Sequence, residues 1–221
     1  MRLLHQPPSC VAIGVDVGAE KLHLVSLDAQ SRIVAMDTVP SGSLLGFDAY
    51  LAHLGKNGVV AIDGPAGPSV GAYAFDAHVS NKFRFARGCE VELGRQRKIW
   101  VSFATGPDPL SGWMAVAESV HQRTENAGFR ALETYPYAIF TTLLGSRPPK
   151  KTSAAGAQER VRLLHASGIR GPNLATRSHD ELDAAAAALV ALHAYHGTAE
   201  AITSPLDHTS IWLPPAGSPP P

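Results

Sequence analysis

Hydrophobic residues open the chain in three short runs, at 10–17, 22–27 and 33–39, that are rich in β-branched and aliphatic side chains. The second run alternates apolar and polar residues, as a strand with one buried face does. Turn-forming residues at 18–20 and 28–31 separate the three runs. Extended runs joined by such short turns predict an antiparallel meander of three strands.

After the third run, the spacing of the apolar residues changes to that of a helix. Apolar residues in segment 43–54 recur on one helical face, which predicts a helix there. The compact apolar run 59–62 follows and predicts a fourth strand that stops at Asp63. Because connections of this kind cross over the sheet in a right-handed sense, we expect the fourth strand to lie parallel to the first.

The middle of the chain is less regular. Segment 66–126 mixes proline, glycine and aromatic residues with weak periodicity, so we expect an irregular insertion with some helix over 113–123. A fifth strand is predicted over 129–134. Further helices are predicted over 138–144, 157–166 and 178–193.

Together these elements predict an α/β fold. Its mixed five-stranded sheet has strands 1 to 3 antiparallel and strands 4 and 5 parallel to strand 1, with helices on its faces. The 221 residues are 45% hydrophobic, which is enough for a single domain over 9–214 with the insertion inside it. The proline-rich end, 215–221, is expected to be disordered.

Charge and targeting signals narrow the class of protein. Lys and Arg together number 19, as do Asp and Glu, so no basic surplus points to nucleic acid, although a local basic stripe remains open. The first residues do not form a secretory signal, and the apolar runs are too short to span a membrane. Cys10 and Cys89 lie far apart with no metal-ligand spacing. We therefore expect a cytoplasmic protein that does not enter a membrane.

Acidic residues stand at the ends of two predicted strands. Asp16 ends the first strand and Asp63 ends the fourth, and each also has an ordinary explanation as a turn residue. If the two strands are neighbours, both carboxylates emerge at the edge of the sheet where α/β proteins bind ligands. Two such residues make the turn explanation less satisfactory than it is for one.

The last predicted helix adds two more acids. Asp180 and Asp183 are three residues apart, so both project from one face of the helix. Asp180 is explained equally well by the helix dipole, whereas Asp183 lies among apolar residues and needs a partner. Clustered carboxylates of this kind suit Mg²⁺ or Mn²⁺.

These pieces resemble the ribonuclease H-like superfamily, and more closely its Holliday-junction resolvase branch and a little-characterised family of predicted nucleases. The resemblance covers nearly the whole chain in order. Each piece is weakly specific alone, and the ordered set is fairly specific. The matching segments are GVDVG at 14–18, RGCE at 87–90, AIDGP at 61–65, ETYP at 133–136, Lys151 with Gly156 and Arg160, HDELDAAAA at 179–187 and IWLP at 211–214.

The resemblance implies a ribonuclease H-like fold and a site for two divalent ions. Asp16 would bridge both ions, Asp63 would hold one, and Asp180 and Asp183 would complete the shell. Glu133 would be a ligand, a supporting acid or a residue of the fold. The resolvases usually carry a glutamate where this chain has Asp63. The expected activity is hydrolysis of phosphodiester bonds, with a homodimer as a further expectation from the resolvase-like relatives.

Basic residues supply candidate contacts to DNA or RNA. They are interleaved with aromatic residues over 82–87 and recur at 150–162, a pattern that suits phosphate contact and base stacking, although a solvated charged edge explains it equally well. The residues predicted to bind nucleic acid are Lys82, Arg84, Arg87, Lys151 and Arg160.

Two other functions remain open from the sequence. One is a nucleic-acid-binding or regulatory module of the same fold with little or no catalysis, which the neutral net charge leaves open. The other is an ATP-handling enzyme of the actin-like and sugar-kinase class, whose first phosphate loop segment 14–21 resembles. That class needs two such cores around the nucleotide, and the chain has length for one.

Overall fold

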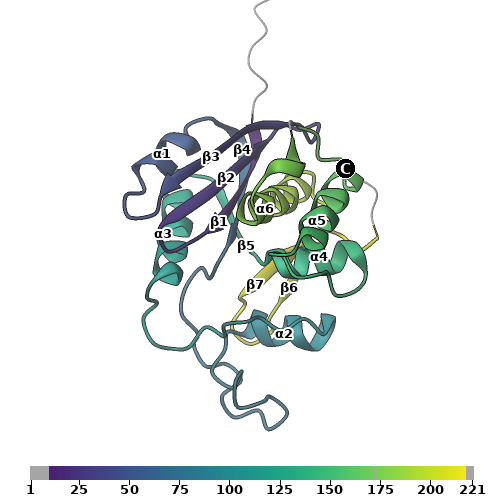
Figure 1. The fold of residues 1–221 in the computed structure, drawn as a ribbon. Coiled ribbons are helices and arrows are strands. Elements are labelled where there is room, and N and C mark those ends of the chain that lie inside the picture. Colours follow the sequence, from purple (N-terminus) through teal and green to yellow (C-terminus); the bar gives the residue numbers. More distant parts are fainter. Residues whose placement is uncertain (1–9, 172, 218–221) are drawn as a thin grey trace, which may run out of the picture.

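A seven-stranded mixed sheet forms the centre of the computed structural model, which describes residues 10–171 and 173–217 (Figure 1). Strands β1 (Cys10–Val17), β2 (Lys21–Leu27) and β3 (Ile33–Pro40) form the predicted antiparallel meander. Strands β4 (Leu54–Asp63) and β5 (Arg130–Thr134) run parallel to β1, also as predicted. The α/β fold class is confirmed, and the arrangement is consistent with a ribonuclease H-like fold.

The sheet has two strands more than the five predicted. β7 (Ser210–Leu213) pairs in parallel with β5, and β6 (Glu200–Thr203) pairs antiparallel with β7 at the edge. Each has four residues, which is too short to show a clear alternation of apolar and polar positions. The strand order is β3-β2-β1-β4-β5-β7-β6.

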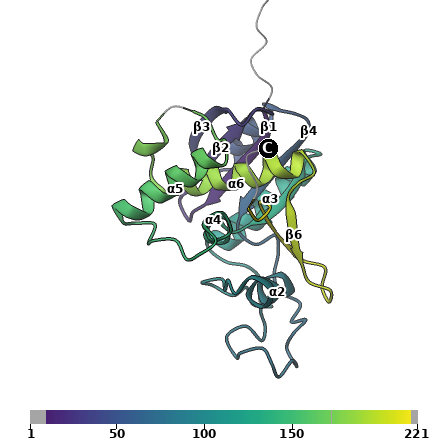
Figure 2. The same ribbon diagram turned by 90° about the vertical axis from the view of Figure 1, so that its right-hand side faces the viewer.

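Helices cover both faces of this sheet (Figures 1 and 2). On one face α6 (His179–Tyr195) lies across β1, β2 and β4, with α4 (Pro136–Leu144) and α5 (Ala154–Ala166) beside it. On the other face lie α1 (Leu45–Leu51) and α3 (Trp113–Asn126). A short 3-10 helix, Leu174–Thr176, precedes α6. The four helices predicted outside 66–126 are all present.

The predicted insertion contains a helix that the sequence does not reveal. The helix α2 (Gly88–Arg97) lies against β6 and β7, and α3 covers the expected helical segment. The apolar pattern of α2 is hidden because Glu90 is buried and because Gly94 lies in the contact with Trp100. A Cβ added at Gly94 would lie 2.5 Å from the Trp100 ring. Polar and small residues on its packed face conceal the helical period.

A close backbone contact sets the height of α6 over the sheet. A Cβ added at Gly14 of β1 would lie 2.1 Å from the carbonyl oxygen of Ala184 and 2.1 Å from the amide nitrogen of Ala188. Only glycine permits this approach. The run of alanines in α6 is fully buried against the strands, so the helix lies directly on the sheet.

The expectations of a disordered end and of no membrane-spanning segment can be compared with the described residues only. The predicted disorder of 215–221 falls mostly on residues 218–221, which lie outside the described part. No helix among the described residues is long and apolar enough to cross a membrane.

Candidate metal site

Two carboxylates end neighbouring parallel strands on the face that α6 covers. Asp16 on β1 is in register with Asp63 on β4. Ile13 and Val15 on β1 and Ile62 on β4 belong to the core on the opposite face. Because side chains alternate along a strand, Asp16 and Asp63 both project toward α6. The predicted convergence of the two strand ends is therefore present in the fold.

The start of α6 adds two further carboxylates. Ser178 caps the helix: its Oγ accepts a hydrogen bond from the Glu181 amide at 3.2 Å, and the Glu181 carboxylate accepts one from the Ser178 amide at 2.9 Å. This capping box fixes the residue at which the helix begins. Asp180 consequently lies in the first turn, and Asp183 follows on the same face.

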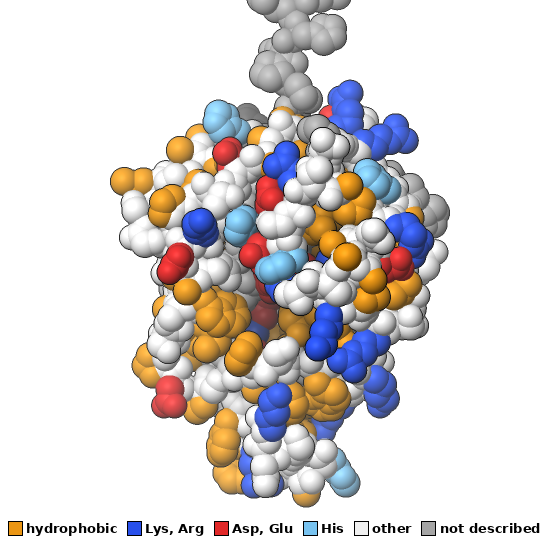
Figure 3. All heavy atoms as spheres, viewed as in Figure 1, with side chains coloured by type: hydrophobic (Ala, Val, Ile, Leu, Met, Phe, Trp, Pro, Cys, Tyr) orange, Lys and Arg blue, Asp and Glu red, His pale blue; other side chains and the backbone are white. Residues whose placement is uncertain are grey.

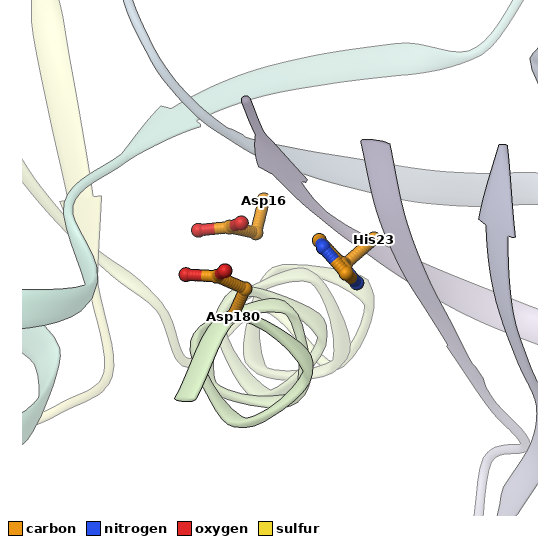
Figure 4. Close-up of side chains that lie close together, drawn as sticks. All are labelled: Asp16, His23 and Asp180. Atoms are coloured by element: carbon orange, nitrogen blue, oxygen red, sulfur yellow. The ribbon is translucent and has the colours of Figure 1, made fainter. Parts of the chain in front are cut away.

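The acids and two histidines form one continuous cluster. Ligand atoms of Asp16, His23 and Asp180 lie within 4.8 Å of one another, and so do those of His179, Asp180 and Asp183. Figure 4 shows the carboxylates of Asp16 and Asp180 facing each other, with the His23 ring beside them from β2. Oxygen and imidazole nitrogen ligands in this arrangement could hold a metal ion.

Crowding of negative charge raises the pKa values of these acids. Burial, followed by the carboxylates of Asp183 and Asp180, raises the pKa of Asp16 to about 8. The pKa of Asp63 is also raised well above its ordinary value by burial and then by Asp16 and Asp183. Acids that resist ionisation in one another's presence gain from a bound cation.

Lys151 and Arg160 offset part of this charge. The Lys151 Nζ lies 2.9 Å from the Asp183 Oδ2 and 3.4 Å from the Asp180 Oδ1. The Arg160 Nε approaches the Asp183 Oδ1 to 3.5 Å without hydrogen-bond geometry, and that oxygen forms no hydrogen bond although the side chain is 5% exposed. A buried carboxylate oxygen without a partner is costly. The residues could therefore hold a metal ion at this position.

The cluster lies in an open cleft of about 1250 Å³. In Figure 3 acidic atoms lie near the middle of the molecular face, with hydrophobic side chains to their lower left and Lys and Arg side chains to their lower right. A substrate with both apolar and anionic parts can reach the carboxylates through such an opening. The cleft is lined by the four aspartates, five Lys or Arg residues and five Trp, Tyr or Phe residues.

His23 is a member of the cluster that the sequence analysis missed. It lies directly opposite Asp16 in the β1–β2 ladder, and its Nδ1 is 3.2 Å from the Thr38 Oγ1. The predicted hairpin contained the information needed to find His23. The short turn after Val17 pairs that residue with Leu22, and hence Asp16 with His23. His179, the first residue of α6, has its Nδ1 2.6 Å from the Asp180 Oδ1.

Glu133 does not join the other predicted acids. On β5 it is in register with Ile62, whose side chain faces the core on the opposite side of the sheet from α6. Its carboxylate accepts hydrogen bonds from the Arg87 guanidinium and from the Ala66 amide at 3.1 Å. Of the roles considered for it, the contacts match a residue that supports the fold beside Asp63.

Two residues predicted to contact nucleic acid are buried. Arg87 is 3% exposed and pairs with Glu133 and Glu90, so it holds the insertion to β5 and is not available to a polynucleotide. Arg160 is also 3% exposed and stacks over the Phe140 ring at 4.8 Å. The prediction failed at these positions because charge in a sequence does not reveal whether a side chain is paired inside the protein.

The other three residues predicted to bind nucleic acid lie at different places on the molecule. Lys151 lines the cleft within reach of the aspartates. Lys82 is exposed, donates a hydrogen bond to the Ser102 carbonyl at 3.2 Å, and lies over the Phe83 ring. Arg84 is partly exposed. Neither Lys82 nor Arg84 lines the cleft.

Comparison with known proteins gives one similarity. A family model described as "Protein of unknown function (DUF429)" matches residues 110–208. The matched region includes Lys151, Asp180 and Asp183, whereas Asp16 and Asp63 precede it. The comparisons with curated proteins and with solved structures found no match.

Proposed function

We propose that this protein hydrolyses phosphodiester bonds with two divalent ions, Mg²⁺ or Mn²⁺. The observation that carries the proposal is the convergence of Asp16, Asp63, Asp180 and Asp183 from three elements, together with the buried Oδ1 of Asp183, which accepts no hydrogen bond. Asp16 would contact both ions, Asp63 one of them, and the two helix acids the rest of the shell. Bound ions supply an activated water and stabilise the leaving oxygen.

The chain's own residues contribute charge and position. Lys151 is half-exposed beside the carboxylates, where its ammonium group can contact a phosphate oxygen of the substrate. Arg160, packed on Phe140 and close to Asp183, holds that carboxylate in place from behind. The capping box of α6 fixes the position of Asp180 and Asp183 relative to the strands.

One contact favours the alternative of a module with the same fold and little catalysis. The Lys151 ammonium group neutralises Asp183 and Asp180 as a fixed ion pair would, which would make a metal ion unnecessary. The ATP-handling alternative requires two cores around a nucleotide, and the described residues form a single sheet. The experiments below separate the first two functions.

The proposed activity predicts metal-dependent cleavage. The purified protein should cleave end-labelled DNA or RNA oligonucleotides in millimolar Mn²⁺ or Mg²⁺ and should be inactive in excess EDTA. The Asp183→Asn variant should lose the activity, because the buried Oδ1 would no longer carry charge for the ion. The matched control Asp37→Asn changes an exposed acid on β3 outside the cleft and should retain it. Equal cleavage by the wild-type protein in EDTA, or by Asp183→Asn in Mn²⁺, would contradict the proposal.

Replacing Lys151 with alanine should tighten Mn²⁺ binding while weakening nucleic-acid binding. The variant removes a positive charge 2.9 Å from Asp183, and for a half-exposed pair we expect roughly a fivefold lower Kd for Mn²⁺. Calorimetry measures the metal affinity, and fluorescence anisotropy measures oligonucleotide binding.

The control for this measurement is Lys150→Ala. Lys150 is exposed and also lines the cleft, but its side chain makes no ion pair in the described part of the chain. It should leave the Mn²⁺ affinity unchanged. An unchanged Mn²⁺ affinity in Lys151→Ala would show that the ammonium group and the ion do not compete, and would contradict this prediction.

A further inference from the structure

Aromatic side chains line one wall of the cleft, and they come from two stretches of the chain. Trp100 and Phe103 lie in the segment between α2 and α3, and Trp113 begins α3. Tyr135 and Tyr137 follow β5, where the strand passes into α4. Such large rings are usually placed in the core, so their position along an opening calls for a functional explanation.

The two most exposed of these rings are Trp100 and Phe103. Trp100 is 42% exposed and Phe103 is 71% exposed. Trp100 nevertheless has firm support, because one side contacts Gly94 of α2 and its ring centroid lies 4.6 Å from that of the buried Phe83. A ring that is supported on one side and open on the other forms a flat surface for stacking.

A side-chain contact joins the two stretches. The Tyr135 hydroxyl lies 3.3 Å from the Ser102 Oγ, between Trp100 and Phe103 in the sequence. The rings of Tyr135 and Tyr137 have centroids 5.9 Å apart. These rings therefore line the same cleft as Asp63 and Asp16.

Cationic residues complete the lining. The cleft has five Lys or Arg residues and five Asp or Glu residues, so its own charge is balanced. Two divalent ions on the acids would leave the lining positive overall, which suits a polyanion. The basic residues are Lys21, Arg147, Lys150, Lys151 and Arg160.

We propose that this cleft selects single-stranded nucleic acid, with unpaired bases stacked on Trp100 and Phe103 and the phosphates directed to the exposed basic residues Lys21, Arg147, Lys150 and Lys151. The inference rests on the proposed function for the role of the ions and goes beyond it in naming the form of the substrate. Aromatic faces accept bases of any identity, but only when those bases are not already stacked within a duplex. A double helix presents its backbone and grooves to the protein and leaves these rings without a partner.

Binding measurements test this inference without depending on cleavage. Fluorescence anisotropy would compare a labelled 12-nucleotide single strand with a blunt duplex of the same length, as DNA and as RNA, in EDTA and, with the Asp183→Asn variant to prevent cleavage, in Mn²⁺. We expect tighter binding of the single strand and quenching of tryptophan fluorescence. The double variant Trp100→Ala/Phe103→Ala should weaken single-strand binding by about tenfold or more and leave the weak duplex binding unchanged.

Two further variants make the result specific. Trp100→Phe keeps a ring face and should restore most of the affinity. Phe75→Ala removes a fully exposed ring that does not line the cleft. It should leave the affinity for the single strand unchanged. Circular dichroism of each variant establishes that it is folded.

The two proposals fail in different ways. Equal affinity for single strand and duplex, or full single-strand binding by a folded Trp100→Ala/Phe103→Ala variant, would overturn the stacking inference. Selective single-strand binding without any metal-dependent cleavage would overturn the proposed function and leave the stacking inference standing. The DNA and RNA arms show which polynucleotide binds more tightly.

Discussion

The Asp16→Asn variant should lose metal-dependent cleavage by about 1000-fold or more, because several kcal/mol of charge stabilisation by the ions would disappear and each 1.4 kcal/mol is tenfold in rate. Asp16 is 7% exposed, and one of its carboxylate oxygens lies within 4.8 Å of a carboxylate oxygen of Asp180 on α6. Its carboxylate is expected to contact both ions. Calorimetry should accordingly show Mn²⁺ binding weakened beyond the millimolar range.

The same substitution should stabilise the metal-free protein. Burial and neighbouring carboxylates raise the pKa of Asp16 to about 8, so ionisation favours the unfolded state as the pH rises from the ordinary carboxyl value toward 8. The amide removes this cost, and we expect a gain on the order of several kcal/mol at pH 8 and little change near pH 4. Urea unfolding in EDTA at the two pH values measures it.

A matched substitution distinguishes the site from general charge effects. Asp37→Asn removes an exposed acid from the same sheet and should change neither the cleavage rate nor the stability difference between the two pH values. If Asp16→Asn is less stable than the wild-type protein in EDTA at pH 8, Asp16 has a favourable structural role that the metal site does not explain.

The Gly14→Ala variant should be destabilised by about 3 kcal/mol or more, at the upper end of what overpacking usually costs. The new Cβ would lie 2.1 Å from backbone atoms of Ala184 and Ala188, and backbone in a helix cannot move aside as a flexible side chain can. α6 must shift away from β1, and Asp180 and Asp183 shift with it. Mn²⁺ affinity should therefore fall together with stability.

Thermal or urea unfolding and calorimetry with Mn²⁺ measure the two effects in the same protein. Gly42→Ala is the control, since an added Cβ there meets no atom within 4 Å and the backbone is not in the left-handed region. It should be neutral in both measurements. Wild-type stability in Gly14→Ala would show that the contact between α6 and β1 is looser in solution than in the structure.

The first five strands and five of the helices could be predicted because local patterns specify them. Apolar and polar residues alternate along β2, and turn-forming residues precede it. The apolar residues of α6 likewise form a local pattern. The site acids were predictable for a related reason: the ends of parallel strands meet at one edge, and acids three residues apart share a helix face. Register in the structure places Asp16 beside Asp63 as this argument requires.

The remaining features depend on contacts that a local pattern does not contain. Glu133 projects away from Asp63 because it is one position out of phase on the neighbouring strand. Arg87 has the same charge in the sequence as Lys151, and only the fold shows that one is buried and the other lines the cleft. The roles of the site residues, the homodimer and the cytoplasmic location stay predictions.

The contact between Gly14 and α6 also has a consequence for biosynthesis. Asp16 and Asp63 lie in the first third of the chain, whereas Asp180 and Asp183 are among the later residues to be synthesised. A nascent chain on the ribosome can form the meander and β4 early, because these are local pairings, but the two halves of the acid cluster remain apart until α6 has emerged. Assembly of the site is thus tied to a late long-range step in folding. A truncated or stalled translation product would carry the strand acids without the helix acids, and so would lack half of the acid cluster.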